Sequence, residues 1–304
     1  MYLTPFSRFS RHVLITGGAS GLGLGCARRF RDLGYDVTIA DVDAAAGASA
    51  AAALNEGARF EPLDLADPAS IRALAGRLVA RGQPIDVLVN NAGIYPPSQR
   101  TLSAEGHELT FAIAHLGHFR LTYALWPLLD AAPAARVISV SSLVQRRSQI
   151  YLDDLTLAAN YEPIRAYGQA KLSCLLFAIG LQQRLANAGS AIASYAAHPG
   201  VCRTQLGRHR RRSAQDSAWQ RFSSWALAWG MSHYGQTPEQ GAEAVVQAAR
   251  SREFAPGSFL GPTGMFEAAG PVGVVQPGAA ASDPALARTL WQRSEALTGL
   301  QWPI

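Results

Sequence analysis

The sequence predicts one α/β domain built on a doubly wound parallel sheet, and two observations lead to this expectation. First, short apolar runs alternate with helical stretches along the chain. The runs expected to form strands lie at 11–16, 36–41, 59–65, 85–90, 136–141 and 191–197. Second, these runs are mostly continuously apolar, as in strands that helices cover on both faces of a parallel sheet. Right-handed crossover connections then give the doubly wound arrangement.

The helical stretches carry their own start and stop signals. Asp67 is a good N-cap, Pro68 suits a first turn, and Gly57 and Gly82 follow two of the stretches. No break in composition and no repeat marks a linker. We therefore expect a single domain over 1–304, with a more irregular substrate lid at about 203–235 and a C-terminal tail at about 255–304. The helices are expected at 21–33, 44–55, 67–82 and 164–188, with a further long helix between the strands at 85–90 and 136–141.

The composition excludes several classes of protein. With 48% hydrophobic and 16% charged residues, the chain is too apolar to be disordered. Cys26, Cys174 and Cys202 have no paired or CxxC spacing, so neither a disulfide framework nor a metal site is expected. No uninterrupted run of about 18 apolar residues is present, and residues 1–10 lack the apolar stretch of a signal peptide. We expect a cytoplasmic protein without stable membrane insertion.

The basic residues are almost all arginine. The net charge is +5, and of 27 Lys and Arg residues only Lys171 is a lysine, which leaves 27 − 1 = 26 arginines. A single lysine in such a chain suggests chemistry that a guanidinium cannot perform. Arg203 and the basic cluster at 208–212 could attract an anionic substrate group, although a solvated loop is the more common explanation. Nothing in the sequence resembles a nucleic-acid reading helix.

A glycine-rich turn follows the first predicted strand and leads directly into a helix. Thr16 is followed by Gly17, Gly21 and Gly23, with Ser20 and Leu22 between them. Glycines here allow a tight turn and a close backbone approach to a pyrophosphate, and the helix N-terminus favours the phosphate charge. The turn predicts a dinucleotide site that these five residues (Gly17, Ser20, Gly21, Leu22 and Gly23) line.

Acidic residues at two strand ends bear on the choice of cofactor. Asp41 lies 18 positions beyond Gly23, where a carboxylate can accept the adenosine ribose hydroxyls and repel the 2′-phosphate of NADP. Ser20 is neutral, so NAD is expected and NADP is disfavoured. The alternative is that Asp41 only starts a turn. Asp64 and Leu65 occupy a position suited to the adenine ring, although a turn-forming Asp64 is nearly as plausible.

Two further motifs point to reacting groups. Asn90, Asn91, Ala92 and Gly93 follow the fourth strand, at the sheet edge where ligands bind in open α/β folds. Tyr167 and Lys171 are four residues apart, on one face of a helix. A nearby ammonium favours the phenolate, which can take or return an alcohol proton during hydride transfer. The tyrosine–lysine spacing alone is weak, because it occurs by chance in many helices.

Together these motifs resemble the short-chain dehydrogenase/reductase family, over essentially the whole chain and in the family's order. The resemblance rests on residues 16–23, 90–93, 141–142, 167–171 and 198–200. It implies a Rossmann-type fold, a homodimer or homotetramer, and a catalytic set of Ser142, Tyr167 and Lys171. Ser142 would hold the substrate oxygen, and Lys171 would also bind the nicotinamide ribose. The family's nicotinamide loop falls on Pro199, Gly200, Val201 and Thr204.

Within the family the chain is similar to the retinol-dehydrogenase-like branch, on residues 115–119, 166–172 and 290–299. That branch implies an NAD(H)-dependent oxidoreductase of a lipophilic alcohol and its aldehyde or ketone. One position departs from it, because Ala114 replaces an Asn that serves a proton relay. His115 or a backbone-bound water could rebuild the relay. Two other hypotheses stay open: a non-redox cyclase, isomerase or dehydratase, and a cofactor-sensing binding protein.

Overall fold

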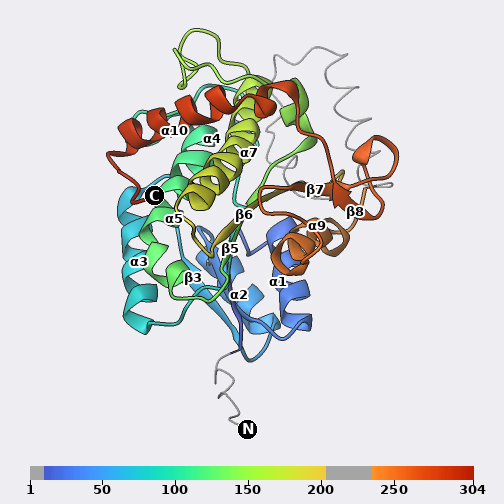
Figure 1. The fold of residues 1–304 in the computed structure, drawn as a ribbon. Coiled ribbons are helices and arrows are strands. Elements are labelled where there is room, and N and C mark those ends of the chain that lie inside the picture. The colour runs from blue at the N-terminus through green and yellow to red at the C-terminus, as the bar shows by residue number, and fades with distance from the viewer. Residues whose placement is uncertain (1–9, 203–234) are drawn as a thin grey trace.

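The computed structural model describes residues 10–202 and 235–304, and their chain forms strands and helices in alternation (Figure 1). The strands in this part of the chain are β1 (His12–Thr16), β2 (Asp36–Asp41), β3 (Ala58–Pro62), β4 (Val87–Asn90), β5 (Arg136–Val140), β6 (Ala193–Ala197), β7 (Phe259–Pro262) and β8 (Val272–Val274). The longer helices are α1 (Gly21–Asp32), α2 (Ala44–Ala53), α3 (Pro68–Arg81), α7 (Pro163–Asn187), α9 (Pro238–Arg250) and α10 (Pro284–Thr298). The shorter ones are α4 (Leu109–Phe111), η1 (Ala112–Gly117), α5 (His118–Ala124), α6 (Trp126–Asp130), η2 (Leu143–Arg147), η4 (Met265–Glu267) and η5 (Ala279–Ser282).

The strands form one sheet in the order β3-β2-β1-β4-β5-β6-β7-β8, which is the doubly wound topology that the sequence predicts. All neighbours pair in parallel except β7 and β8, which are antiparallel. The strand order reverses direction between β1 and β4. Loops therefore diverge there at the carboxyl ends of the strands, where open α/β sheets bind ligands.

Alternate residues of β1 show how helices cover both sheet faces. Val13 and Ile15 pack with α1 and α9, whereas Leu14 packs with α3, α5 and α7. All three side chains are fully buried, as expected for a central strand whose side chains alternate between two covered faces. In Figure 1, α1, α2 and α9 lie on one side of the sheet, and α3, α5 and α7 lie on the other.

The structure differs from the sequence prediction mainly toward the C-terminus. The expected irregular tail contains β7, β8 and α10, and α9 precedes it, so much of this region extends the main fold. Strand β3 ends at Pro62 rather than residue 65, and the long helix expected between β4 and β5 is divided among α4, η1, α5 and α6. The proposed lid at about 203–235 lies almost wholly outside the described residues. In the described part of the chain, no helix combines the length and apolarity needed to cross a membrane.

Candidate active site

The glycine-rich turn joins β1 to α1 at the point where the strand order reverses. Gly17 has a φ of +63°, and a Cβ on Gly23 would collide with the carbonyl of Gly17. This close packing of the helix start on the turn requires glycine at both positions. Ser20 is the N-cap of α1, yet its exposed side chain makes no capping hydrogen bond. Leu22 packs its side chain into the core, so it offers a ligand only backbone.

Thr16 connects this turn to the end of β4. Its hydroxyl oxygen accepts hydrogen bonds from the backbone N–H groups of Asn91 (2.9 Å) and Ala92 (3.0 Å). It also lies 2.8 Å from Nε2 of His118. The Asn91 side chain donates back to the Thr16 carbonyl at 2.7 Å. The two loops predicted to bind the cofactor are therefore held together through one buried threonine.

His118 completes this connection from the other side and was missed as a site residue in the sequence. Its Nδ1 lies 2.8 Å from the carbonyl oxygen of Ala114, and burial lowers the pKa of the ring to about 4. The imidazole is therefore neutral at pH 7. With one proton, Nδ1 donates to Ala114 and Nε2 accepts from the Thr16 hydroxyl. In the sequence His118 is visible only as the second histidine of residues 115–119. Its partner, Thr16, lies 102 positions earlier.

Asp41 ends β2 with its carboxylate facing the glycine-rich turn. Oδ2 accepts a hydrogen bond from Ala19 N at 3.0 Å, and Oδ1 accepts one from Asp43 N at 3.1 Å. Each carboxylate oxygen has a second lone pair, so these bonds leave capacity for ribose hydroxyls. Asp41 therefore shapes its own turn, which was the alternative, and also places negative charge beside the phosphate turn.

Three other predicted cofactor residues use their side chains elsewhere. Asp64 accepts from Ala66 N at 2.8 Å, which is the turn role that the sequence left open. Leu65 packs into the core beneath α3 and α5. Asn90 is buried and donates to Thr122 at 3.1 Å, so its side chain points into the protein rather than toward the cleft. For Leu65 and Asn90, the backbone is what remains available to a cofactor.

The predicted catalytic residues lie on α7 and just after β5. Lys171 is buried, and its Nζ donates to the Val140 carbonyl oxygen at 3.1 Å. A Cβ on Gly93 would come within 3.4 Å of that Nζ, so the fourth residue of the 90–93 motif borders the ammonium. Tyr167 lies one helical turn earlier, half-buried, with its ring 5.7 Å from that of Tyr95.

The two serines after β5 have different surroundings. Ser141 is buried, and its hydroxyl donates to the backbone carbonyl of Lys171 at 2.7 Å. Ser142 is half-buried, caps η2, and accepts a long 3.4 Å hydrogen bond from Val144 N. Ser141 therefore holds α7 against β5, whereas the Ser142 hydroxyl is the one with capacity for a ligand. This difference agrees with the choice of Ser142 over Ser141.

Ala114 lies in η1, a π-helical segment that interrupts the helix between β4 and β5. π-helical insertions of this kind are frequent at functional sites. Its carbonyl oxygen accepts from His118 and, at 3.2 Å, from the thiol of Cys174. A narrow space is lined by Ala114, Asn90, His115 and Ser139. The side chains of Asn90 and Ser139 each have a buried oxygen without a hydrogen-bond partner among the described residues.

His115 is poorly suited to replace the missing relay side chain. Its Nε2 lies 2.7 Å from the hydroxyl of Ser294 in α10. Burial lowers the pKa of His115 to about 3, so the ring remains neutral at pH 7 and is a weak proton carrier. His115 instead anchors α10 to the body of the protein.

Residues 198–202 follow β6 and contain Pro199, Gly200 and Val201, three of the four residues predicted to hold the nicotinamide; this segment is called the nicotinamide loop below. Gly200 N donates to Nδ1 of His198 at 3.1 Å, and Val201 N donates to Ala268 O at 2.9 Å. The Pro199 carbonyl accepts from the Gln236 side chain at 2.8 Å. The loop is therefore held by Ala268 and Gln236 from outside and by one hydrogen bond within the loop itself. Thr204, Arg203 and the 208–212 cluster lie outside the described residues.

Comparison with known proteins decides the family. The model of the family described as short chain dehydrogenase matches residues 11–215. The chain belongs to this family. Its members are oxidoreductases, and a nicotinamide cofactor accompanies their fold in solved structures complexed with NAD or NADH.

Named relatives cover nearly the whole length of this short-chain dehydrogenase. Human retinol dehydrogenase 13 is 34% identical over 96% of this chain and 85% of its own length. Mouse polyprenol dehydrogenase is 34% identical over 95% and 84%, respectively. A crystal structure of a protein of unassigned function from Mycobacterium paratuberculosis superposes with a TM-score of 0.77 at 33% identity, covering 98% of this chain and 97% of that one. The resemblance to the retinol-dehydrogenase-like branch is thereby confirmed.

Proposed function

We propose that this short-chain dehydrogenase is an NAD(H)-dependent oxidoreductase that interconverts a lipophilic alcohol and its aldehyde or ketone, with Tyr167 as the general acid/base. One observation carries the proposal. The chain's single lysine is buried beside Gly93, one helical turn from Tyr167. Its Nζ donates to the carbonyl oxygen of Val140, the last residue of β5, which lies two positions before Ser142. Burying an ammonium is costly, so a chain that does so at the carboxyl edge of its sheet has a chemical use for that charge.

Each residue of the set has a distinct task. The glycine-rich turn and residues 90–93 would hold the nicotinamide cofactor, which when bound would supply the hydride for the carbonyl carbon. Tyr167 delivers a proton to the substrate oxygen during reduction and removes it during oxidation. Ser142 donates a hydrogen bond to the same oxygen and so orients the substrate. Lys171 places a buried positive charge one helical turn from Tyr167 and would also hold the nicotinamide ribose.

The preference for NAD rests on charge near the glycine-rich turn. The Asp41 carboxylate is fixed there by Ala19 N, and the residue that follows, Val42, is neutral and 69% exposed. A 2′-phosphate would meet a carboxylate without a compensating cation nearby on this strand end. Ribose hydroxyls would instead find a hydrogen-bond acceptor.

A lipophilic substrate is supported by the relatives and by the cleft. Retinol and polyprenol, which the names of the relatives print, are long apolar alcohols. In this chain the ring of Tyr95 packs against that of Tyr167, which places an aromatic surface beside the proposed reacting group. The cytoplasmic location and the homodimer or homotetramer stay predictions.

The decisive experiment compares the purified wild-type protein with Tyr167→Phe, using NADH oxidation with a panel of long-chain aldehydes that includes decanal. We expect turnover by the wild type and a loss of about 10²-fold or more in the variant, since one hydroxyl is removed from proton transfer. NADH binding, measured by calorimetry, should be retained. A variant with wild-type turnover would contradict the mechanism. Tight NADH binding without turnover in either protein would favour the cofactor-sensing alternative.

A further inference from the structure

Two consecutive residues in the loop between β7 and β8 have left-handed backbone angles. Phe266 has a φ of +53° and Glu267 a φ of +54°, a conformation that is unfavourable for residues with a Cβ. The turn leaves the Phe266 side chain 85% exposed and directs Glu267 inward, with 17% of its side chain exposed. The left-handed backbone at these two positions therefore directs the Glu267 carboxylate toward the interior of the protein.

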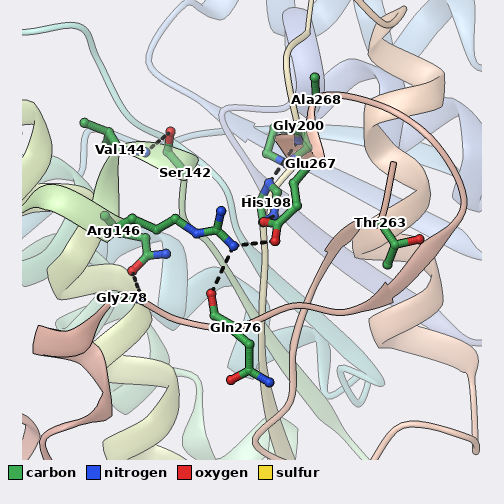
Figure 2. Close-up of polar contacts among 12 residues, drawn as sticks. Ser142, Val144, Arg146, His198, Gly200, Thr263, Glu267, Ala268, Gln276 and Gly278 are labelled. Atoms are coloured by element: carbon green, nitrogen blue, oxygen red, sulfur yellow. Dashed lines mark hydrogen bonds and ion pairs between the residues drawn. The ribbon is translucent and has the colours of Figure 1, made fainter. Parts of the chain in front are cut away.

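The Glu267 carboxylate reaches residues from two different segments (Figure 2). Oε1 forms an ion pair with the guanidinium of Arg146, and Oε2 lies 3.2 Å from Nε2 of His198. Arg146 belongs to η2, the short helix that Ser142 caps. His198 is the first residue of the nicotinamide loop. One carboxylate therefore links the element that carries the substrate-binding serine to the loop predicted to hold the nicotinamide.

The state of His198 determines what Glu267 can do for it. The ring is fully buried, and its Nδ1 accepts from Gly200 N, so the proton of a neutral ring is on Nε2, facing Glu267. Burial lowers the pKa of His198 to about 4, although Glu267 acts in the opposite direction. At 3.2 Å the two atoms face each other without the alignment of a full hydrogen bond, and neither has another partner among the described residues.

Backbone contacts from the same C-terminal stretch support both segments. Ala268, next to Glu267, accepts hydrogen bonds from Val201 N and, at 3.1 Å, from the Gln236 side chain. On the other side, the Gln145 side chain accepts from Gly278 N at 2.9 Å. A Cβ on Gly261 would collide with the His198 ring, so β7 leaves room for the imidazole only because glycine is there.

We infer that Glu267 is a positioning residue that holds the nicotinamide loop, through His198, and the Ser142 end of η2, through Arg146, in one fixed relation. The inference rests on the proposed function, because this relation matters when hydride passes between a nicotinamide and a substrate carbon. An error of about 1 Å in such alignment can cost about 10²-fold in rate. The carboxylate touches neither reacting partner. It acts through the two segments that do.

The test compares Glu267→Gln with Glu105→Gln, a matched control in which a carboxylate paired with Arg120 is removed on a different loop. Single-turnover NADH oxidation with decanal should slow about tenfold or more in Glu267→Gln, and NADH affinity should change by less than about threefold, because the adenosine half is held by other elements. A general loss of folding would instead lower the active fraction and leave the single-turnover rate unchanged. Glu105→Gln should match the wild type.

A double variant and an activity-independent measurement complete the test. If the carboxylate acts through Arg146, Glu267→Gln combined with Arg146→Gln should be no slower than the worse single variant, whereas additive losses would overturn the inference. Amide hydrogen exchange in the cofactor-free protein should rise at both 198–202 and 142–147 in Glu267→Gln. Unchanged exchange at either segment would overturn the inference whatever the activity. If amide exchange rises at both segments in Glu267→Gln but the wild type oxidises no NADH, only the proposed function is contradicted.

Discussion

The Asp41 carboxylate accepts a hydrogen bond from the backbone N–H of Ala19 at 3.0 Å, so the residue predicted to bind the ribose also shapes the glycine-rich turn. These two tasks have different consequences for substitution. Removing the carboxylate alters cofactor charge preference and the turn together. Adding a cation next to it alters the charge alone. Comparing a variant that lacks the carboxylate with one that has an added cation therefore separates the effect on cofactor charge preference from the effect on the turn.

We expect the double variant Asp41→Ala/Val42→Arg to reverse cofactor preference. Loss of the carboxylate removes repulsion of the 2′-phosphate, and the added guanidinium attracts it. The ratio of NADPH to NADH dissociation constants should fall by about tenfold or more, as measured by calorimetry. Val42→Arg alone, which leaves the bond to Ala19 intact, is the control and should shift the ratio less. Unchanged ratios in both proteins would remove Asp41 from the cofactor site.

Two substitutions of Lys171 test separately how its charge and its shape contribute to activity. Lys171→Met keeps the length but removes the ammonium, leaving the Val140 carbonyl without its donor, at a cost of about 1–3 kcal/mol in the free energy of unfolding. Turnover should fall about 10²-fold. Lys171→Arg keeps the charge but places a larger planar group beside Gly93, so we expect it to recover little activity. Wild-type turnover in Lys171→Arg would show that a positive charge suffices.

Ala114→Asn tests whether the missing side chain limits proton transfer. Ala114 lines a narrow space together with Asn90 and Ser139, whose side chains each have a buried oxygen without a hydrogen-bond partner among the described residues, so an added amide has candidate partners. We expect turnover to rise severalfold while the NADH dissociation constant stays within about twofold. Ala114→Leu, similar in size but without polar atoms, is the control. An equal rate in the wild type and Ala114→Asn would show that the relay is bypassed.

The buried histidines predict a loss of stability in mild acid. Burial lowers the pKa of His118 to about 4, whereas the unfolded chain takes up a proton near pH 6.5. Between these values the unfolded state binds more protons, so stability falls as the pH decreases from about 6.5 to about 4. At pH 5 this histidine should contribute a loss of about 2 kcal/mol.

Urea unfolding at pH 7.5 and pH 5.0 measures this loss. His118→Asn should show a smaller difference between the two pH values, because one such histidine is removed, even if it is less stable overall. His107, half-buried at the surface, supplies the comparison variant His107→Asn, which should retain most of the wild-type difference. A wild-type unfolding free energy that is flat between the two pH values would contradict the prediction.

Local signals predicted the parts of the fold that depend on local physics. The continuous apolar runs gave β1, β2, β4, β5 and β6, because a central parallel strand needs apolar side chains on both faces. The glycines of residues 17–23 identified the phosphate turn, because close packing at Gly23 excludes any side chain. Strands β7 and β8 were missed, since they are short and β7 contains both Gly261 and Pro262.

Contacts between distant segments could not be predicted from one sequence. Nothing near Glu267 indicates that its carboxylate meets Arg146, which lies 121 positions earlier. The position of His118 beneath Thr16 depends on the π-helical turn of η1, and therefore on packing rather than on propensity. Asn90 belongs to a motif predicted to face the cofactor, but the direction of its side chain is set by Thr122.

The pairing of β1 with β4 governs how the protein can reach its native state. Thr16 receives its two backbone hydrogen bonds from residues 75 and 76 positions later. The entropy cost of closing a loop of that length is incurred before these contacts contribute any stability. Such non-local pairing therefore slows folding. During synthesis, a nascent chain released only as far as α2 or α3 has the glycine-rich turn and Asp41, but not the residues after β4 that donate to Thr16. The junction between the glycine-rich turn and residues 90–93 can therefore form only after β4 has left the ribosome and inserted beside β1.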